Sequence, residues 1–106
     1  MTEAEIEFER PVSLGDALAI CRRHRVSPTQ LVTRTPLRGE KTTGLMVDPG
    51  MDEEAIVERF REAGRSAAVV VDQMFATGNA GDLRALGREP PVQSVFLKPP
   101  SGSLNR

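Results

Sequence analysis

Hydrophobic and polar residues alternate at the start of the chain. Glutamates take the odd positions and apolar residues the even ones, from Glu3 to Glu9. A period of two predicts a β-strand with one buried face and one acidic, solvated face. We expect this strand to end at Pro11, because proline has no backbone N–H to donate to a sheet.

The spacing then changes to that of an amphipathic helix. Ser13 is a suitable N-cap, and Asp16 three residues later completes a variant of the capping box. Apolar residues at 14, 17, 18 and 21 predict a helix that runs to about Arg25, and Pro28 prevents its continuation. Residues 29–35 are predicted to form a second strand.

The second part of the chain has a similar pattern. Residues 42–48 predict a third strand, which returns from the second through a turn at 37–41. Asp52 is the expected N-cap of a second helix, which buries Ile56 and Phe60 and ends at Gly64. Strands are then predicted at 67–71 and 92–98, and residues 76–91 are expected to form loops around a short helix at 82–86.

These elements repeat at a spacing of about 38 residues. The helix starts at 12–19 and 50–57 share this offset, as do the strand residues 31–33 and 69–71. Two successive strand–helix–strand units predict an α+β, ferredoxin-like βαββαβ fold, with two helices on one face of an antiparallel sheet. The strand at 92–98 is expected at an edge of the sheet. We expect one domain over residues 1–98 and a flexible tail over 99–106.

Composition narrows the classes of function. A net charge of −1 and the absence of Trp and Tyr argue against nucleic-acid binding, which needs positive charge and often uses stacking rings. No apolar run reaches the roughly 18 residues of a membrane span. The acidic start also lacks the features of a signal peptide, so we expect a cytoplasmic protein without membrane contact.

Few residues offer metal or catalytic chemistry. Cys21 and His24 lie three residues apart on the first predicted helix, but the chain has no other Cys or His, and a structural zinc site needs four ligands. We interpret Cys21 as a core residue and His24 as a surface residue. The carboxylates fall on helix starts or on the alternating strand, where nothing desolvates them for acid–base work. We therefore expect no metal, no cofactor and no catalytic residue.

Glycines before the short helix stand where backbone amides cradle phosphate in some nucleotide-binding proteins. The residues concerned are Gly78, Asn79 and Gly81. The segment lacks Gly-Lys-Ser/Thr, and Asp82 would itself occupy the anion position. We therefore favour a connecting loop over a phosphate site.

The first strand–helix junction, Glu9-Arg10-Pro11-Val12-Ser13-Leu14, resembles that of ACT domains. These are small regulatory modules with a βαββαβ fold that bind amino acids or similar effectors, often across paired subunits. Glu9 replaces the acid of their Asp-Arg-Pro-Gly-type sequence, and Val12 stands where they have glycine. The resemblance spans residues 4–72. It implies an effector site made of Pro11, Val12, Ser13, Gly15 and Asp16.

Three functions follow from these patterns. We favour a noncatalytic protein-interaction or regulatory module that forms a homodimer or other self-association through its sheet, because two helices leave one sheet face open. The residues expected at that interface are Val69, Val70, Val71, Val95 and Leu97. The alternative is an ACT-like sensor of a small molecule such as an amino acid. The second alternative is an inhibitor-like protein that inserts its C-terminal strand, 92–98, into a protein partner.

Overall fold

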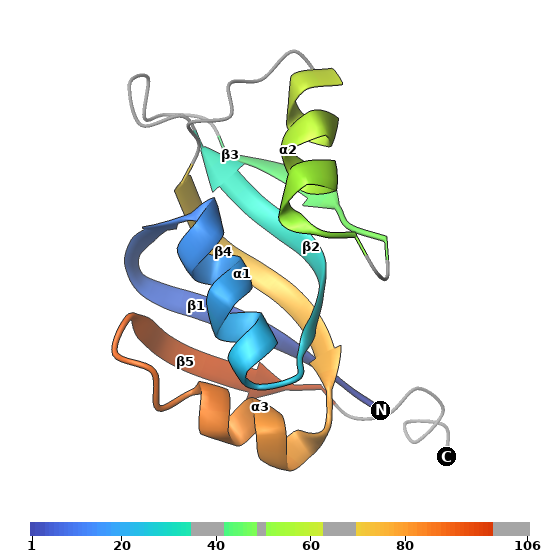
Figure 1. Cartoon of the computed structure of the whole chain (residues 1–106). Coiled ribbons are helices and arrows are strands. Elements are labelled where there is room, and N and C mark those ends of the chain that lie inside the picture. The colour runs from blue at the N-terminus through green and yellow to red at the C-terminus, as the bar shows by residue number, and fades with distance from the viewer. Residues whose placement is uncertain (35–41, 49–50, 63–69, 99–106) are drawn as a thin grey trace, which may run out of the picture.

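The computed structural model describes residues 1–34, 42–48, 51–62 and 70–98, which form an α+β protein with a five-stranded sheet and three helices (Figure 1). The elements in chain order are β1 (Thr2–Ser13), α1 (Leu14–Arg23), β2 (Ser27–Arg34), β3 (Thr42–Met46), α2 (Glu53–Glu62), β4 (Val70–Gly78), α3 (Ala80–Leu86) and β5 (Val92–Leu97). The strand order is β3-β2-β4-β1-β5, and all neighbouring strands are antiparallel.

The α+β class, the antiparallel sheet and the edge position of the last strand agree with the sequence-based expectations. The ferredoxin-like topology is not confirmed, because β4 lies between β2 and β1 and pairs antiparallel with both. The expected turn at 37–41, the helix end at Gly64 and the tail at 99–106 lie outside the described residues.

The helices pack on one face of the sheet, with α1 across its middle and α3 beside β5 (Figure 1). The predicted alternation on β1 decides which of its side chains meet them: Ala4, Ile6 and Phe8 are buried. Ile6 pairs with Met74, which pairs with Leu31, so these three form a buried row across the sheet. The helices complete this core with Leu14, Ala17, Leu18, Ile20, Cys21, Ile56, Phe60, Leu83 and Leu86.

The prediction that the first strand ends at Pro11 is wrong, because β1 continues to Ser13. Glu7 pairs with Gln73 and Val12 with Val71, so the register shifts between these two pairs. Pro11 lies in this irregular stretch, where its missing N–H interrupts no regular ladder. Val12 is then buried, which returns the strand to the core.

The first helix begins where the sequence predicts, with the Asp16 amide donating to Ser13 Oγ at 3.1 Å. It ends at Arg23, earlier than the predicted Arg25. Arg25 takes the left-handed conformation with φ 58°, and the Val26 amide donates to the Cys21 carbonyl at 2.9 Å. These features are those of a Schellman motif, which ends a helix without help from Pro28.

The fourth strand extends well beyond the predicted 67–71, because β4 continues to Gly78. Met74 and Ala76 are buried, whereas Gln73, Phe75 and Thr77 are partly exposed. This alternation is the period of a strand, so the expected loop from 76 onward is wrong at its first residues. No helix within the described residues is long and apolar enough to cross a membrane.

Candidate functional site

The residues expected to bind an effector form the junction between β1 and α1. Ser13 Oγ already accepts from the Asp16 amide at 3.1 Å, and Val12 belongs to the core. A Cβ on Gly15 would lie 3.3 Å from Glu53 Oε2, so α2 closes over that position. The structure brings these residues together and gives them capping and packing roles. None of them lines the hollow beside α1 or the hollow near Glu3 and Lys98.

The glycines considered for phosphate binding have structural roles too. Gly78 is the last residue of β4, where a Cβ would lie 3.2 Å from Val26 Cγ2. Asn79 is the N-cap of α3, and its side chain accepts from the Gly81 amide at 2.8 Å. The Gly81 amide is therefore already paired, and α3 has only seven residues.

The expected interface residues do not form one exposed patch. Val71 is fully buried, and Val95 and Leu97 pack against the core on the helix side of the sheet. Val70 is half-buried at the start of β4, and Val69 lies outside the described residues. β5 is paired with β1 from Ala4–Leu97 to Phe8–Val92, so the C-terminal strand is already part of this sheet.

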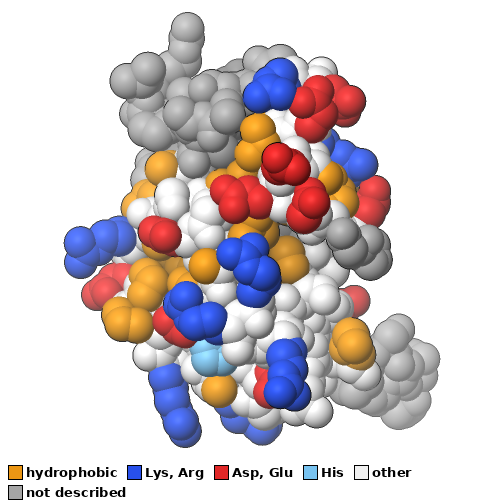
Figure 2. Space-filling view, in the orientation of Figure 1, with side chains coloured by type: hydrophobic (Ala, Val, Ile, Leu, Met, Phe, Trp, Pro, Cys, Tyr) orange, Lys and Arg blue, Asp and Glu red, His pale blue; other side chains and the backbone are white. Residues whose placement is uncertain are grey.

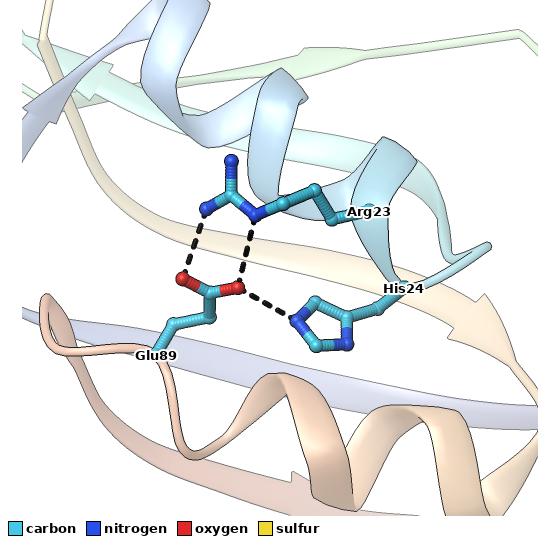
Figure 3. Close-up of polar contacts among 3 residues, drawn as sticks. All are labelled: Arg23, His24 and Glu89. Atoms are coloured by element: carbon cyan, nitrogen blue, oxygen red, sulfur yellow. Dashed lines mark hydrogen bonds and ion pairs between the residues drawn. The ribbon is translucent and has the colours of Figure 1, made fainter.

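Cys21 and His24, three residues apart, have different environments. Burial raises the pKa of the Cys21 thiol to about 12, with a smaller opposing effect from Arg22, and its Sγ lies 3.6 Å from Met74 Sδ. His24 is partly buried, and its Nε2 lies 2.7 Å from Glu89 Oε2 (Figure 3). Within the described residues, no group of three His, Cys, Asp or Glu side chains is placed to hold a metal ion.

Glu89 connects the end of α1 to the loop before β5. It also accepts hydrogen bonds from Arg23 Nη2 and Nε at 2.9 and 3.1 Å (Figure 3). The hydrogen bonds from Arg23 and His24 both lower the pKa of the Glu89 carboxyl, and the effect of Arg23 is the larger. Sequence reasoning missed Glu89, which has no local signal beyond the Pro90-Pro91 pair that follows it.

A hollow of about 320 Å³ lies between α1, the start of β2 and the segment before α2. Apolar side chains such as Leu18, Val26 and Met51 line it together with charged groups at its rim. Residues 49–50, which join two lining segments, lie outside the described residues. The hollow therefore supports no assignment of a ligand.

The opposite face of the sheet, here called the open face, carries no helix within the described residues. The residues on this face are identified by pairing, because residues paired across antiparallel strands face the same side of the sheet. They are Gly44 and Met46 on β3, Gln30 and Val32 on β2, Gln73, Phe75 and Thr77 on β4, Glu3, Glu5 and Glu7 on β1, and Ser94, Phe96 and Lys98 on or just after β5. The helix side, by contrast, has acidic side chains gathered around α2 and mainly basic ones in its lower half (Figure 2).

One row of the open face crosses the whole sheet. Its members pair in the order Met46, Gln30, Phe75, Glu5 and Phe96. Met46 is 61% exposed and Phe96 is 63% exposed, so the row carries an exposed apolar group at each edge. Phe75 occupies its centre, on the middle strand.

Polar contacts fix the middle of the open face. Gln73 Nε2 donates a hydrogen bond to Glu5, and Lys98 Nζ lies 4.8 Å from the centre of the Phe75 ring. A polar hollow of about 370 Å³ lies near the starts of β1 and β2 and is lined by Glu3, Gln30 and Lys98 among others. The face therefore combines aromatic groups with carboxylates and amides held in defined positions.

Comparison with protein-family models, with curated proteins and with solved structures found no match to this chain.

Proposed function

We propose that the protein is a noncatalytic protein-interaction module and that the open face of its sheet is the binding surface. The observation that carries this proposal is the pair of exposed apolar side chains, Met46 and Phe96, at the two ends of one cross-strand row. Scattered exposed apolar residues are ordinary on proteins. Here they share one face with the Phe75 ring, and together these side chains make a defined surface.

The chemistry of the open face suits a protein partner better than a small molecule. Small-molecule sites are mainly apolar pockets that enclose most of their ligand, whereas the open face is broad and its hollow near Glu3 and Lys98 is mainly polar. Aromatic side chains and methionine are enriched at protein interfaces, where polar groups surround them. The row of Met46, Gln30, Phe75, Glu5 and Phe96 has this composition.

The test is the double variant Met46→Ser/Phe96→Ser. Both side chains are largely exposed, so the fold should persist, as circular dichroism and thermal unfolding can verify. We expect wild-type association, measured by sedimentation velocity and by affinity capture, to be lost in the double variant. Arg84→Ser, an exposed change on α3, is the matched control and should leave association intact. Association that survives the double variant unchanged would overturn the proposal.

A further inference from the structure

We infer that the occupant of the open face is a second copy of this chain, packed face to face about a two-fold axis parallel to β4. The inference rests on the proposed function and specifies its partner. It follows from the place of each residue on the sheet, and the charges of the face select this axis over the other symmetric arrangement.

β4 is the middle strand of the five, with β2 and β1 beside it and β3 and β5 at the edges. A two-fold axis parallel to β4 places β3 over the partner's β5 and β2 over the partner's β1. Along the central row, Met46 then meets the partner's Phe96 and Gln30 meets the partner's Glu5. Phe75 meets the partner's Phe75 on the axis.

Each of these contacts joins compatible groups. Methionine sulfur and methyl groups pack favourably against aromatic rings, so Met46 and the partner's Phe96 cover each other's exposed surface. The Gln30 amide can donate to the partner's Glu5 carboxylate, which gives a charge-assisted hydrogen bond. The two Phe75 rings lie near the axis, each with the Lys98 ammonium of its own copy 4.8 Å from the ring centre. Every contact away from the axis occurs twice, as an isologous interface requires.

The acidic stripe of Glu3, Glu5 and Glu7 decides between the symmetric arrangements. A two-fold axis perpendicular to the strands would place β1 over the partner's β1 and bring six carboxylates together. The axis parallel to β4 instead places this stripe over β2, whose open-face residues include Gln30 and Val32. With strands about 4.8 Å apart and sheets about 10 Å apart, the two stripes are then about 14 Å apart. That exceeds the screening length of about 8 Å at physiological salt.

The size of the face sets the expected strength. Five strands spaced about 4.8 Å apart span about 19 Å, and a strand of six residues such as β5 extends about 20 Å. The face therefore covers roughly 400 Å², about half of the roughly 800 Å² per partner of a standard interface. We therefore expect a transient dimer with a dissociation constant in the micromolar range.

Cross-linking of cysteine variants with a short bismaleimide tests the register. Met46→Cys and Phe96→Cys should each cross-link poorly with themselves, because identical edge residues lie about 22 Å apart across the axis. An equimolar mixture of the two variants should cross-link efficiently. Gln73→Cys, on the central strand, should cross-link with itself, whereas Glu7→Cys on the neighbouring strand should not. The native Cys21 is buried and does not compete.

Sedimentation equilibrium from about 10 µM to 1 mM supplies the mass. We expect a monomer–dimer equilibrium that Gln30→Lys tightens roughly fivefold, since each new ammonium faces the partner's Glu5 and two such pairs form. A strictly monomeric mass at 1 mM would overturn the second-copy inference. The proposed function would then stand only if the wild type captures another protein that the Met46→Ser/Phe96→Ser variant fails to capture.

Two other results separate the proposals. A dimer that depends on Met46 and Phe96 but gives self-cross-links at both edge positions would overturn this two-fold register and leave the binding surface in place. A dimer that forms equally well in Met46→Ser/Phe96→Ser as in the wild type would overturn the register and the proposed function together. Circular dichroism of each variant verifies that its fold is retained, so no result reflects unfolding.

Discussion

Glu89 and Arg23, 66 residues apart in the chain, form a bidentate ion pair. Arg23 Nη2 donates to Glu89 Oε1 at 2.9 Å and Arg23 Nε donates to Glu89 Oε2 at 3.1 Å. His24 adds a third contact to the same carboxylate at 2.7 Å. Together they attach the C-terminal end of α1 to the segment that leads into β5. Because β5 supplies Phe96 to the open face, this pair also helps to position one edge of the proposed binding surface.

The Glu89 contacts predict a stability that depends on acid pH. The folded-state pKa of this carboxyl lies below its ordinary value of 4.5, so its contribution is fully present above that value and is lost as pH falls through the folded pKa. Glu89→Gln should therefore lower the melting temperature by a few degrees at pH 7, and the difference should shrink below about pH 4. Glu54→Gln, exposed on α2, is the control. An equal difference at pH 7 and pH 3 would contradict this account.

Arg25 predicts a stabilising substitution. A left-handed conformation costs a residue with a Cβ about 1–2 kcal/mol, and glycine avoids this cost while losing about 0.5–1 kcal/mol of backbone entropy. Arg25→Gly should raise the free energy of unfolding by about 0.5–1 kcal/mol in urea titrations. Arg22→Gly, inside the last helical turn, should instead lower it by about 1 kcal/mol. Destabilisation by Arg25→Gly would show that its side chain matters more than its backbone.

Ser13 allows its capping role to be separated from a ligand-binding role. Ser13→Ala removes the acceptor for the Asp16 amide and should destabilise the protein by about 1 kcal/mol. Ser13→Gly should cost only a few tenths of a kcal/mol, since glycine is tolerated at an N-cap. Thermal unfolding measures both. Equal losses for the two variants would argue against the cap as the source of the effect.

Cys21 should resist thiol reagents in the native state. Its thiol is buried and its pKa is raised to about 12, so very little thiolate forms at neutral pH. Labelling by a disulfide reagent should proceed only as fast as the protein opens, and should become rapid in denaturant. Cys21→Ser should cost about 1–3 kcal/mol, because a buried hydroxyl needs a hydrogen-bond partner. Rapid labelling of the folded protein would contradict this placement.

Sequence patterns predicted the local elements well where one short signal controlled them. The alternation from Glu3 to Phe8 predicted which face of β1 is buried, and Ser13 and Asp52 are the caps that the pattern indicated. The end of α1 was harder to predict, because the left-handed residue that follows it is Arg25, whereas glycine is the residue that usually indicates this position in a sequence. β4 was mistaken for a loop from residue 76, since glycine near its end obscured the alternation of Met74 and Ala76.

The strand order and the binding surface belong to the tertiary structure. Periodicity and capping act over a few residues, so they were enough to predict five strands, two capped helices and an acidic face on β1. Only the fold decided that β4 lies between β2 and β1, since pairing over long separations has no local signal. That order placed Val71, Val95 and Leu97 against the core on the helix side of the sheet. It also aligned Met46, Phe75 and Phe96 in one row of the open face.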